Sequence, residues 1–78
     1  MYTVVGYDKD NDAFVCYGNF EVLAKAVDKA KELAKQIECG TLKRRCSDGT
    51  EEPIDWIEVY WNWNKDDEDM IWASYDDM

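Results

Sequence analysis

The sequence predicts a single α+β domain, a four-stranded antiparallel sheet (β-β-α-β-β) with one helix packed on one face, followed by an acidic C-terminal helix or strand. Three observations lead to this fold class: two short Val-, Tyr- and Phe-rich segments around a turn, one stretch of helical periodicity, and one strongly alternating segment. With 78 residues, the chain has room for one small domain. We expect residues 1–64 to form that domain and the acidic, aromatic residues 65–78 to pack on it.

The first half of the chain predicts a hairpin and a helix. Residues 2–7 and 13–17 flank a cluster of turn-forming residues at 8–12, which is typical of an antiparallel hairpin. Apolar side chains then recur at helical spacing, and Asn19 and Gly40 are suited to the two ends of a helix. The apolar stripe of this predicted helix consists of Phe20, Leu23, Ala24, Val27, Ala30, Ala34 and Ile37.

The second half of the chain offers two further strands. Residues 41–46 have extended character, and we expect their basic run at 43–45 to pair across strands with Asp55 and Glu58. Residues 54–63 carry the strongest strand signal of the chain. Alternation in this segment places Ile57, Val59, Trp61 and Trp63 on the face toward the helix, and Ile54, Trp56, Glu58, Tyr60 and Asn62 on the opposite, open face.

The C-terminal segment is compatible with two structures. Four acids at 66–69 precede apolar residues at 71, 75 and 78, a spacing that suits the first turn of a short amphipathic helix. The Ile, Trp and Tyr residues within 70–75 equally favour an additional strand.

Little in the sequence indicates catalysis or metal binding. The chain has no His, no Gly-rich phosphate loop and no nucleophile with a recognisable activating partner, so we expect neither an enzyme nor a cofactor. The acids at 8, 10 and 12 resemble the start of a calcium loop, but Ala13 and Asn19 occupy the positions that require Gly and Glu. We therefore expect no specific metal site. Cys16, Cys39 and Cys46 are expected to be buried thiols.

Charge is the most informative feature of the sequence. Residues 1–45 hold eight basic and seven acidic side chains, a net charge of +1, whereas residues 46–78 hold one basic and eleven acidic ones, a net charge of −10. Six of the eleven aromatic residues lie in the same acidic part. Phosphate backbones bind clustered Lys and Arg, so a chain with a net charge of −9 is not expected to bind nucleic acid directly.

The acidic part of the chain has two interpretations. Its charges can be a solvated rim that keeps an aromatic-rich domain soluble, or they can form a docking face that steers toward a basic surface and anchors it with aromatic rings. The second interpretation predicts a non-enzymatic binding protein whose partner is a basic, nucleic-acid-binding protein, blocked by charge mimicry. The residues expected to contact that partner are Asp55, Trp56, Glu58, Tyr60, Asp66, Asp67, Glu68, Asp69 and Trp72.

In size and charge the chain resembles the small acidic inhibitors that phages use against restriction enzymes and CRISPR complexes. This resemblance implies an anti-restriction or anti-CRISPR inhibitor, acting in the cytoplasm of the host cell if it is phage-encoded. It rests on size and charge and carries over no individual residue.

Two other classes of function remain open. A structural or assembly protein would use the aromatic sheet face to pair with a second copy as a homodimer, and a ligand-binding domain would use the same face for a small molecule. The sequence contains neither a signal-peptide pattern nor the run of about 20 apolar residues that a membrane span needs, so we expect a cytoplasmic protein without a membrane partner.

Overall fold

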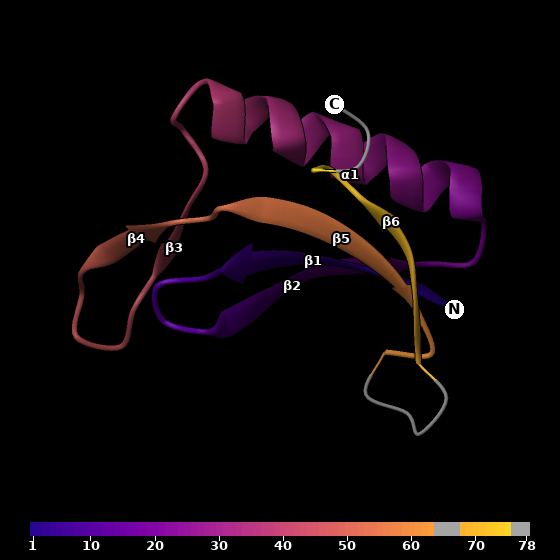
Figure 1. Ribbon diagram of the computed structural model, residues 1–78, viewed down its shortest axis with the longest axis horizontal. Coiled ribbons are helices and arrows are strands. Elements are labelled where there is room, and N and C mark those ends of the chain that lie inside the picture. The colour runs from indigo at the N-terminus through magenta and orange to yellow at the C-terminus, as the bar shows by residue number, and fades with distance from the viewer. Residues whose placement is uncertain (64–67, 76–78) are drawn as a thin grey trace.

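A computed structural model describes residues 1–63 and 68–75 of the chain. One helix lies across one face of a four-stranded antiparallel sheet with the strand order β2-β1-β5-β6 (Figure 1). The predicted α+β class is therefore confirmed, with a four-stranded antiparallel sheet and one packed helix. The elements are β1 (Tyr2–Asp8), β2 (Ala13–Phe20), α1 (Leu23–Glu38), β3 (Lys43–Arg45), β4 (Glu51–Pro53), β5 (Trp56–Trp61) and β6 (Asp69–Ala73).

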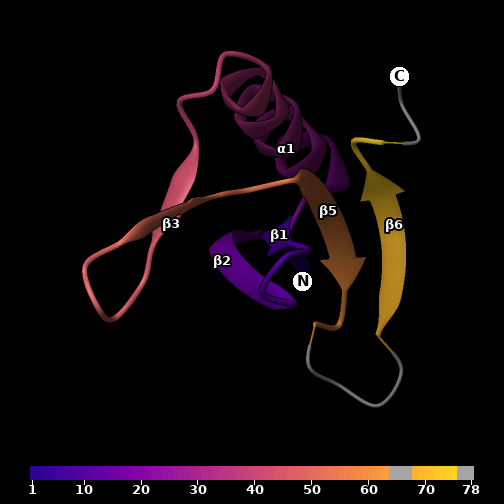
Figure 2. The same ribbon diagram turned by 60° about the vertical axis from the view of Figure 1, so that its left-hand side comes forward.

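The fourth strand of the sheet comes from the C-terminal segment. Strand β6 pairs with β5, whereas β3 pairs with β4 in a separate two-stranded ribbon that projects from one end of the sheet (Figure 2). The residues of β3 are Lys-Arg-Arg, so this strand has no apolar side chain to bury against α1, while β6 brings Ile71, Trp72 and Ala73 to the edge of the sheet. The strand alternative for this part of the chain is confirmed, and the helix alternative is wrong for residues 69–73.

The hydrophobic core lies between α1 and the sheet. Val4 of β1 and Ile57 and Val59 of β5 are fully buried, as the alternation in β5 predicts for its helix-facing positions. The buried positions of the helix are Ala26, Ala30 and Leu33, whereas Ala24 of the predicted stripe is exposed. The full buried cluster consists of Val4, Ala26, Ala30, Leu33, Ile54, Ile57 and Val59. Ile54, which alternation places on the open face, belongs to this cluster because it precedes β5 and does not share its alternation.

The start of the helix differs from the sequence prediction. Asn19 is not the cap, because β2 continues to Phe20, which pairs with Tyr2, and the hydroxyl of Thr3 donates a hydrogen bond to Asn19 Oδ1 at 2.6 Å. The helix begins at Leu23 after Val22, without a side-chain cap. Its end agrees with prediction, since Gly40 has a φ of +72° just beyond the last helical turn.

The β3–β4 ribbon is attached to the sheet by an ion pair that the sequence analysis did not predict. The Nε atom of Arg44 lies 2.9 Å from Oδ2 of Asp8, which is fully buried at the end of β1. Across the ribbon, Arg44 faces Glu52. The predicted pairing of the basic run with Asp55 and Glu58 is therefore wrong, because the run lies in the ribbon, outside the sheet that contains β5.

The cysteines also differ from expectation. Cys16 and Cys39 are exposed and Cys46 is half-buried, and all three are free thiols. Cys16 lies on the strand face that α1 leaves open, opposite Val5 of β1, and Cys39 follows the last helical residue at the surface. Cys16 and Cys39 are therefore surface residues, and the prediction of buried thiols is wrong for these two.

Candidate functional site

The face of the sheet opposite α1 carries a cluster of aromatic rings. Tyr7 of β1 pairs with Phe14 of β2 on one side and with Trp56 of β5 on the other, so strand register places these three rings side by side on one face. Tyr60 projects to the same face two residues beyond Glu58 in β5. Together they line a depression of about 340 Å³, here called the aromatic pocket, whose lining residues are Tyr7, Lys9, Asp12, Phe14, Trp56, Glu58 and Tyr60.

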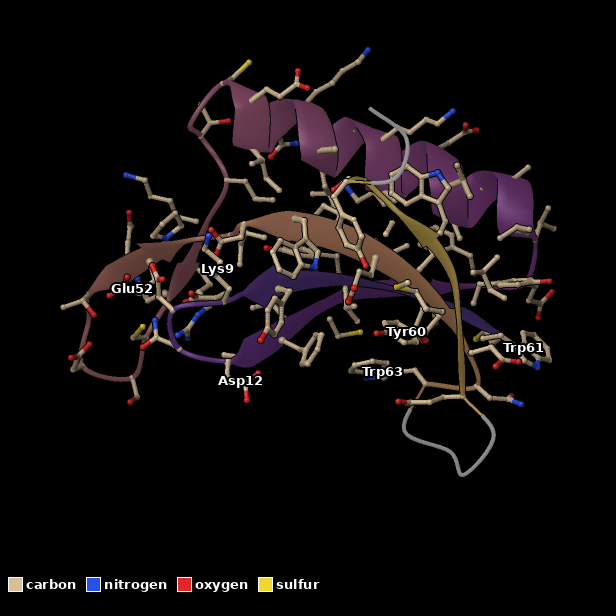
Figure 3. The ribbon with its side chains drawn as sticks, in the orientation of Figure 1. Lys9, Asp12, Glu52, Tyr60, Trp61 and Trp63 are labelled. Carbon is tan, nitrogen blue, oxygen red and sulfur yellow. The ribbon has the colours of Figure 1, made fainter. Side chains whose placement is uncertain are left out.

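Ring contacts form a continuous arc around this pocket. The ring centroid of Tyr7 lies 4.9 Å from that of Trp56 and 4.7 Å from that of Phe14. Trp63 extends the arc, because its ring lies 5.2 Å from Phe14 and 4.7 Å from Tyr60. Figure 3 shows Tyr60 and Trp63 together on the side of the sheet away from α1. The arc thus begins at Trp56 and ends at Tyr60.

Glu58 lies between the two ends of the arc. Its side chain is buried, with 6% of its surface exposed. Among the described residues its hydrogen-bond donor is the hydroxyl of Tyr60, at 3.2 Å from Oε1, and no Lys or Arg of that part of the chain forms an ion pair with it. A buried carboxylate without a counter-ion is energetically costly, so this carboxylate is the chemically distinctive group of the pocket.

The two tyrosines of the pocket are held as neutral hydrogen-bond donors. Burial, with a further contribution from the Glu58 charge, raises the pKa of Tyr60 to about 12. The hydroxyl of Tyr7 donates a hydrogen bond to Asp12 Oδ1 at 2.6 Å, and this bond is the main cause of the raised pKa of Tyr7. Tyrosine is protonated at neutral pH even with its ordinary pKa of 10.0, and the raised values extend this neutral state to higher pH.

The structure brings together three of the predicted partner-binding residues, Trp56, Glu58 and Tyr60. Asp55 precedes β5 outside the aromatic pocket, where its Oδ2 accepts a hydrogen bond from the backbone N–H of Lys9 at 2.8 Å. This contact ties the β1–β2 loop to the start of β5.

None of the described C-terminal residues that were predicted to bind the partner lines the aromatic pocket. Glu68 and Asp69 are exposed at the start of β6, and the charge of Glu68 contributes to the raised pKa of Tyr60. Trp72 pairs with Val59 and packs against the buried core, so it lies on the helix-facing side of the sheet. Asp66 and Asp67 lie outside the described residues.

Sequence reasoning missed Tyr7, Phe14 and Trp63 as members of the site. Period-two alternation in the hairpin carries the signal for Tyr7 and Phe14, once β1 is known to lie between β2 and β5. Trp63 was expected on the helix side, but β5 ends at Trp61 and Asn62 has a φ of +56°, so the strand alternation no longer applies. Trp61 itself is 37% exposed and contacts Tyr2, with ring centroids 5.0 Å apart.

A second depression of about 250 Å³ adjoins the first at Trp56. It lies between the end of α1, the start of β5 and the residues after β6, and we call it the helix-side cavity. Trp56 contributes to both depressions, and its ring contacts Tyr75 at a centroid distance of 5.3 Å. Its indole N–H is buried without an acceptor among the described residues. The helix-side cavity is lined by Ala34, Ile37, Glu38, Asp55, Trp56, Ser74 and Tyr75.

The described residues contain neither a cluster of metal ligands nor a helix able to span a membrane. Residues 1–63 and 68–75 contain no group of three or more Cys, Asp or Glu side chains arranged to hold a metal ion. Within the same ranges, no helix has the length and apolar character needed to span a bilayer. Comparison of the chain with protein-family models, curated proteins and solved structures finds no match.

Proposed function

We propose that this chain is a non-enzymatic binding protein that engages a basic surface of a partner protein through the open face of its sheet. The observation that carries this proposal is the aromatic pocket, in which one exposed ring and three half-buried ones surround a buried carboxylate that lacks a counter-ion among the described residues. Aromatic rings are the residues that most often anchor protein interfaces, and carboxylates among them select positively charged partners.

The surrounding charge supports the same proposal. Residues 46–78, which supply half of the sheet, have a net charge of −10, and Glu68 and Asp69 are exposed at the start of β6. An acidic surface of this kind attracts a basic partner over a Debye length of about 8 Å at physiological ionic strength. A partner that normally binds nucleic acid offers such a surface, so binding here would compete with nucleic acid and would make the chain an inhibitor, in the cytoplasm, of the anti-restriction or anti-CRISPR kind.

Charge reversal at the start of β6 provides the test. The chain would be immobilised, exposed to lysate, and the captured proteins eluted by a salt gradient with and without nuclease and competitor DNA. A captured basic protein would then be purified and its association rate measured against the Glu68→Lys/Asp69→Lys variant. We expect that rate to fall about tenfold or more, because steering depends on the charge near the docking face.

The matched control is Glu21→Lys/Glu32→Lys, which changes the net charge by the same amount at exposed positions before and within α1, on the other side of the sheet. This control should keep most of the wild-type association rate. Equal loss in both variants would show an effect of net charge alone, and unchanged rates in both would contradict the proposal.

Self-association is the rival outcome of the same experiment. Phe14 on the open face and Met70 and Ile71 in the edge strand β6 are 43–45% exposed, which favours contact between copies. A molecular mass that rises with protein concentration and does not depend on salt, with no basic protein captured, would replace the proposed function by assembly of a homodimer.

A further inference from the structure

We propose that the aromatic pocket binds the guanidinium group of one arginine side chain, with Glu58 as the counter-ion and the surrounding rings as stacking surfaces. This inference rests on the proposed function and specifies which chemical group of a basic partner the open face recognises. It follows from three features of the pocket: a charge without a counter-ion among the described residues, its walls and its hydrogen-bonding groups.

No described Lys or Arg side chain forms an ion pair with Glu58, so a cation from outside the described residues would stabilise its charge. Asp8 is also buried, but its carboxylate accepts hydrogen bonds from Arg44 Nε at 2.9 Å and from Asn11 Nδ2 at 2.8 Å, so a cation balances its charge. Glu58, in contrast, accepts a hydrogen bond from the neutral hydroxyl of Tyr60. Lys9 lines the pocket too, yet it forms no ion pair with this carboxylate. A bound cation would offset the cost of burying the Glu58 charge.

The walls of the pocket suit a flat, weakly hydrated cation. Aromatic rings attract cations at their faces, and Arg contributes to such contacts more often than Lys. Trp56 and Tyr7, with centroids 4.9 Å apart, line one side of the pocket, and Tyr60, whose ring packs against Trp63, lines another. A depression of about 340 Å³ has room for a guanidinium group with part of its aliphatic stem.

Hydrogen bonding separates guanidinium from the other cations that aromatic pockets accept. One oxygen of Glu58 already accepts the Tyr60 hydroxyl, so the carboxylate retains acceptor capacity for the parallel N–H groups of a guanidinium. A quaternary ammonium has no N–H to donate and would leave that capacity unused. A lysine ammonium donates, but it is compact and strongly hydrated and loses more on entering an apolar pocket.

The binding test uses small probes of matched shape. The indole N–H signals of the four tryptophans would be followed by NMR during titration with Nα-acetylarginine amide, Nα-acetyllysine amide or Nα-acetylcitrulline amide. Citrulline has nearly the shape of arginine without its charge. We expect the arginine probe to shift the signals of Trp56 and Trp63 with a dissociation constant of about 1 mM, the lysine probe to bind several-fold more weakly, and the citrulline probe to produce no saturable shift.

Substitution of the counter-ion completes the test. Glu58→Gln should weaken binding of the arginine probe at least about tenfold, because the ion pair is lost while the shape is kept. Glu32→Gln, on the exposed side of α1, is the matched control and should leave binding unchanged. If Glu58→Gln does not fold, Phe14→Leu removes one ring at a 45% exposed position, and it should weaken binding of the same probe.

Three outcomes would overturn the inference: equal shifts from arginine and citrulline probes, equal shifts in all four tryptophans, or arginine affinity that survives Glu58→Gln. Any of these, together with salt-dependent capture of a basic protein, would remove the arginine pocket and leave the proposed function standing. Conversely, arginine binding in the pocket without capture of any basic protein would support the pocket and contradict the proposed partner class.

Discussion

Asp8 and Glu58 are two buried carboxylates with different surroundings. Asp8 is hydrogen-bonded by Asn11 and Arg44, and these contacts hold its pKa below the usual value for aspartate. The pair attaches the β3–β4 ribbon to β1, so its role is in the fold. Glu58 has the hydroxyl of Tyr60 as its described donor and faces a depression open to solvent. Unlike the charge of Asp8, the charge of Glu58 is therefore not offset by an ion pair within the described residues.

The pH dependence of Tyr60 gives a prediction at the scale of one residue. Its pKa is raised from 10.0 to about 12 in the folded chain, so the neutral phenol is favoured by folding. The resulting stability is complete below pH 10 and is lost as the pH rises through about 12. In a spectrophotometric titration of tyrosinate, Tyr60→Phe should remove one of the steps at the highest pH.

The titration of the Glu58→Gln variant checks the cause of the shift. Burial is the largest cause and the Glu58 charge the next, so the Tyr60 step should move to lower pH in this variant without reaching 10.0. A Tyr60 step at the same pH in Glu58→Gln and in the wild type would contradict the assigned environment of the pocket.

At the scale of elements, the packing of β1 against its neighbours depends on Gly6. A Cβ atom at this position would lie 2.7 Å from Cε2 of Tyr17 and 2.9 Å from Cγ2 of Ile54, closer than carbon atoms pack. Gly6→Ala should therefore lower the free energy of unfolding by about 1–3 kcal/mol, measured by urea denaturation.

Gly40→Ala is the comparison for that prediction. The Cβ atom would meet nothing within 4 Å there, and its cost comes from the φ of +72°, about 1 kcal/mol. If Gly6→Ala proved no more costly than Gly40→Ala, the close packing of Tyr17 and Ile54 around β1 would be refuted.

The individual elements could be predicted from the sequence, but the pairing of the edge strand could not. Periodicity identified the hairpin, the helix and β5, because each of these signals is contained in a short segment. Alternation within β5 likewise placed Trp56, Glu58 and Tyr60 on the open face. The choice of β6 over β3 as the fourth strand depends on which of the two segments, one before and one after β5 in the chain, buries apolar side chains beside β5. Each segment read by itself can form a strand, so strand propensity alone does not say which of them pairs with β5.

The remaining members of the site were unpredictable for the same reason. Phe14 lies beside Tyr7 on the neighbouring strand, and it lines the pocket only because β1 lies between β2 and β5. Trp63 contacts the rings of Phe14 and Tyr60 after Asn62 adopts a left-handed conformation directly behind β5, and Asn is one of the few residues that tolerate it. The acids at 66 and 67 were assigned to the docking face from composition, and that assignment stays a prediction.

At the scale of the whole molecule, the net charge of −9 predicts a dependence of stability on salt. The chain measures 32 × 27 × 18 Å, whereas the Debye length falls from about 30 Å at 10 mM salt to about 8 Å at 150 mM. Repulsion therefore acts across the whole molecule at low salt and is screened at physiological salt. The unfolding temperature should rise over this range of NaCl concentration.

Reducing the net charge provides the control for the salt prediction. In Glu68→Lys/Asp69→Lys the net charge becomes −5, and the rise of the unfolding temperature with salt should be smaller than in the wild type. An unfolding temperature that does not change with salt, or that falls, would mean that local ion pairs outweigh the overall repulsion.

Trp56 lines two depressions of the molecule. Among their lining residues, it is the one that the aromatic pocket and the helix-side cavity have in common. Its indole is a common wall of the aromatic pocket and of the helix-side cavity, which Ala34 and Ile37 of α1 also line. Both depressions are bounded by the same ring, so any rotation of the Trp56 indole would change the shape of both at once. If the proposed arginine site is real, a molecule bound beside Ile37 would therefore be expected to alter arginine binding on the open face.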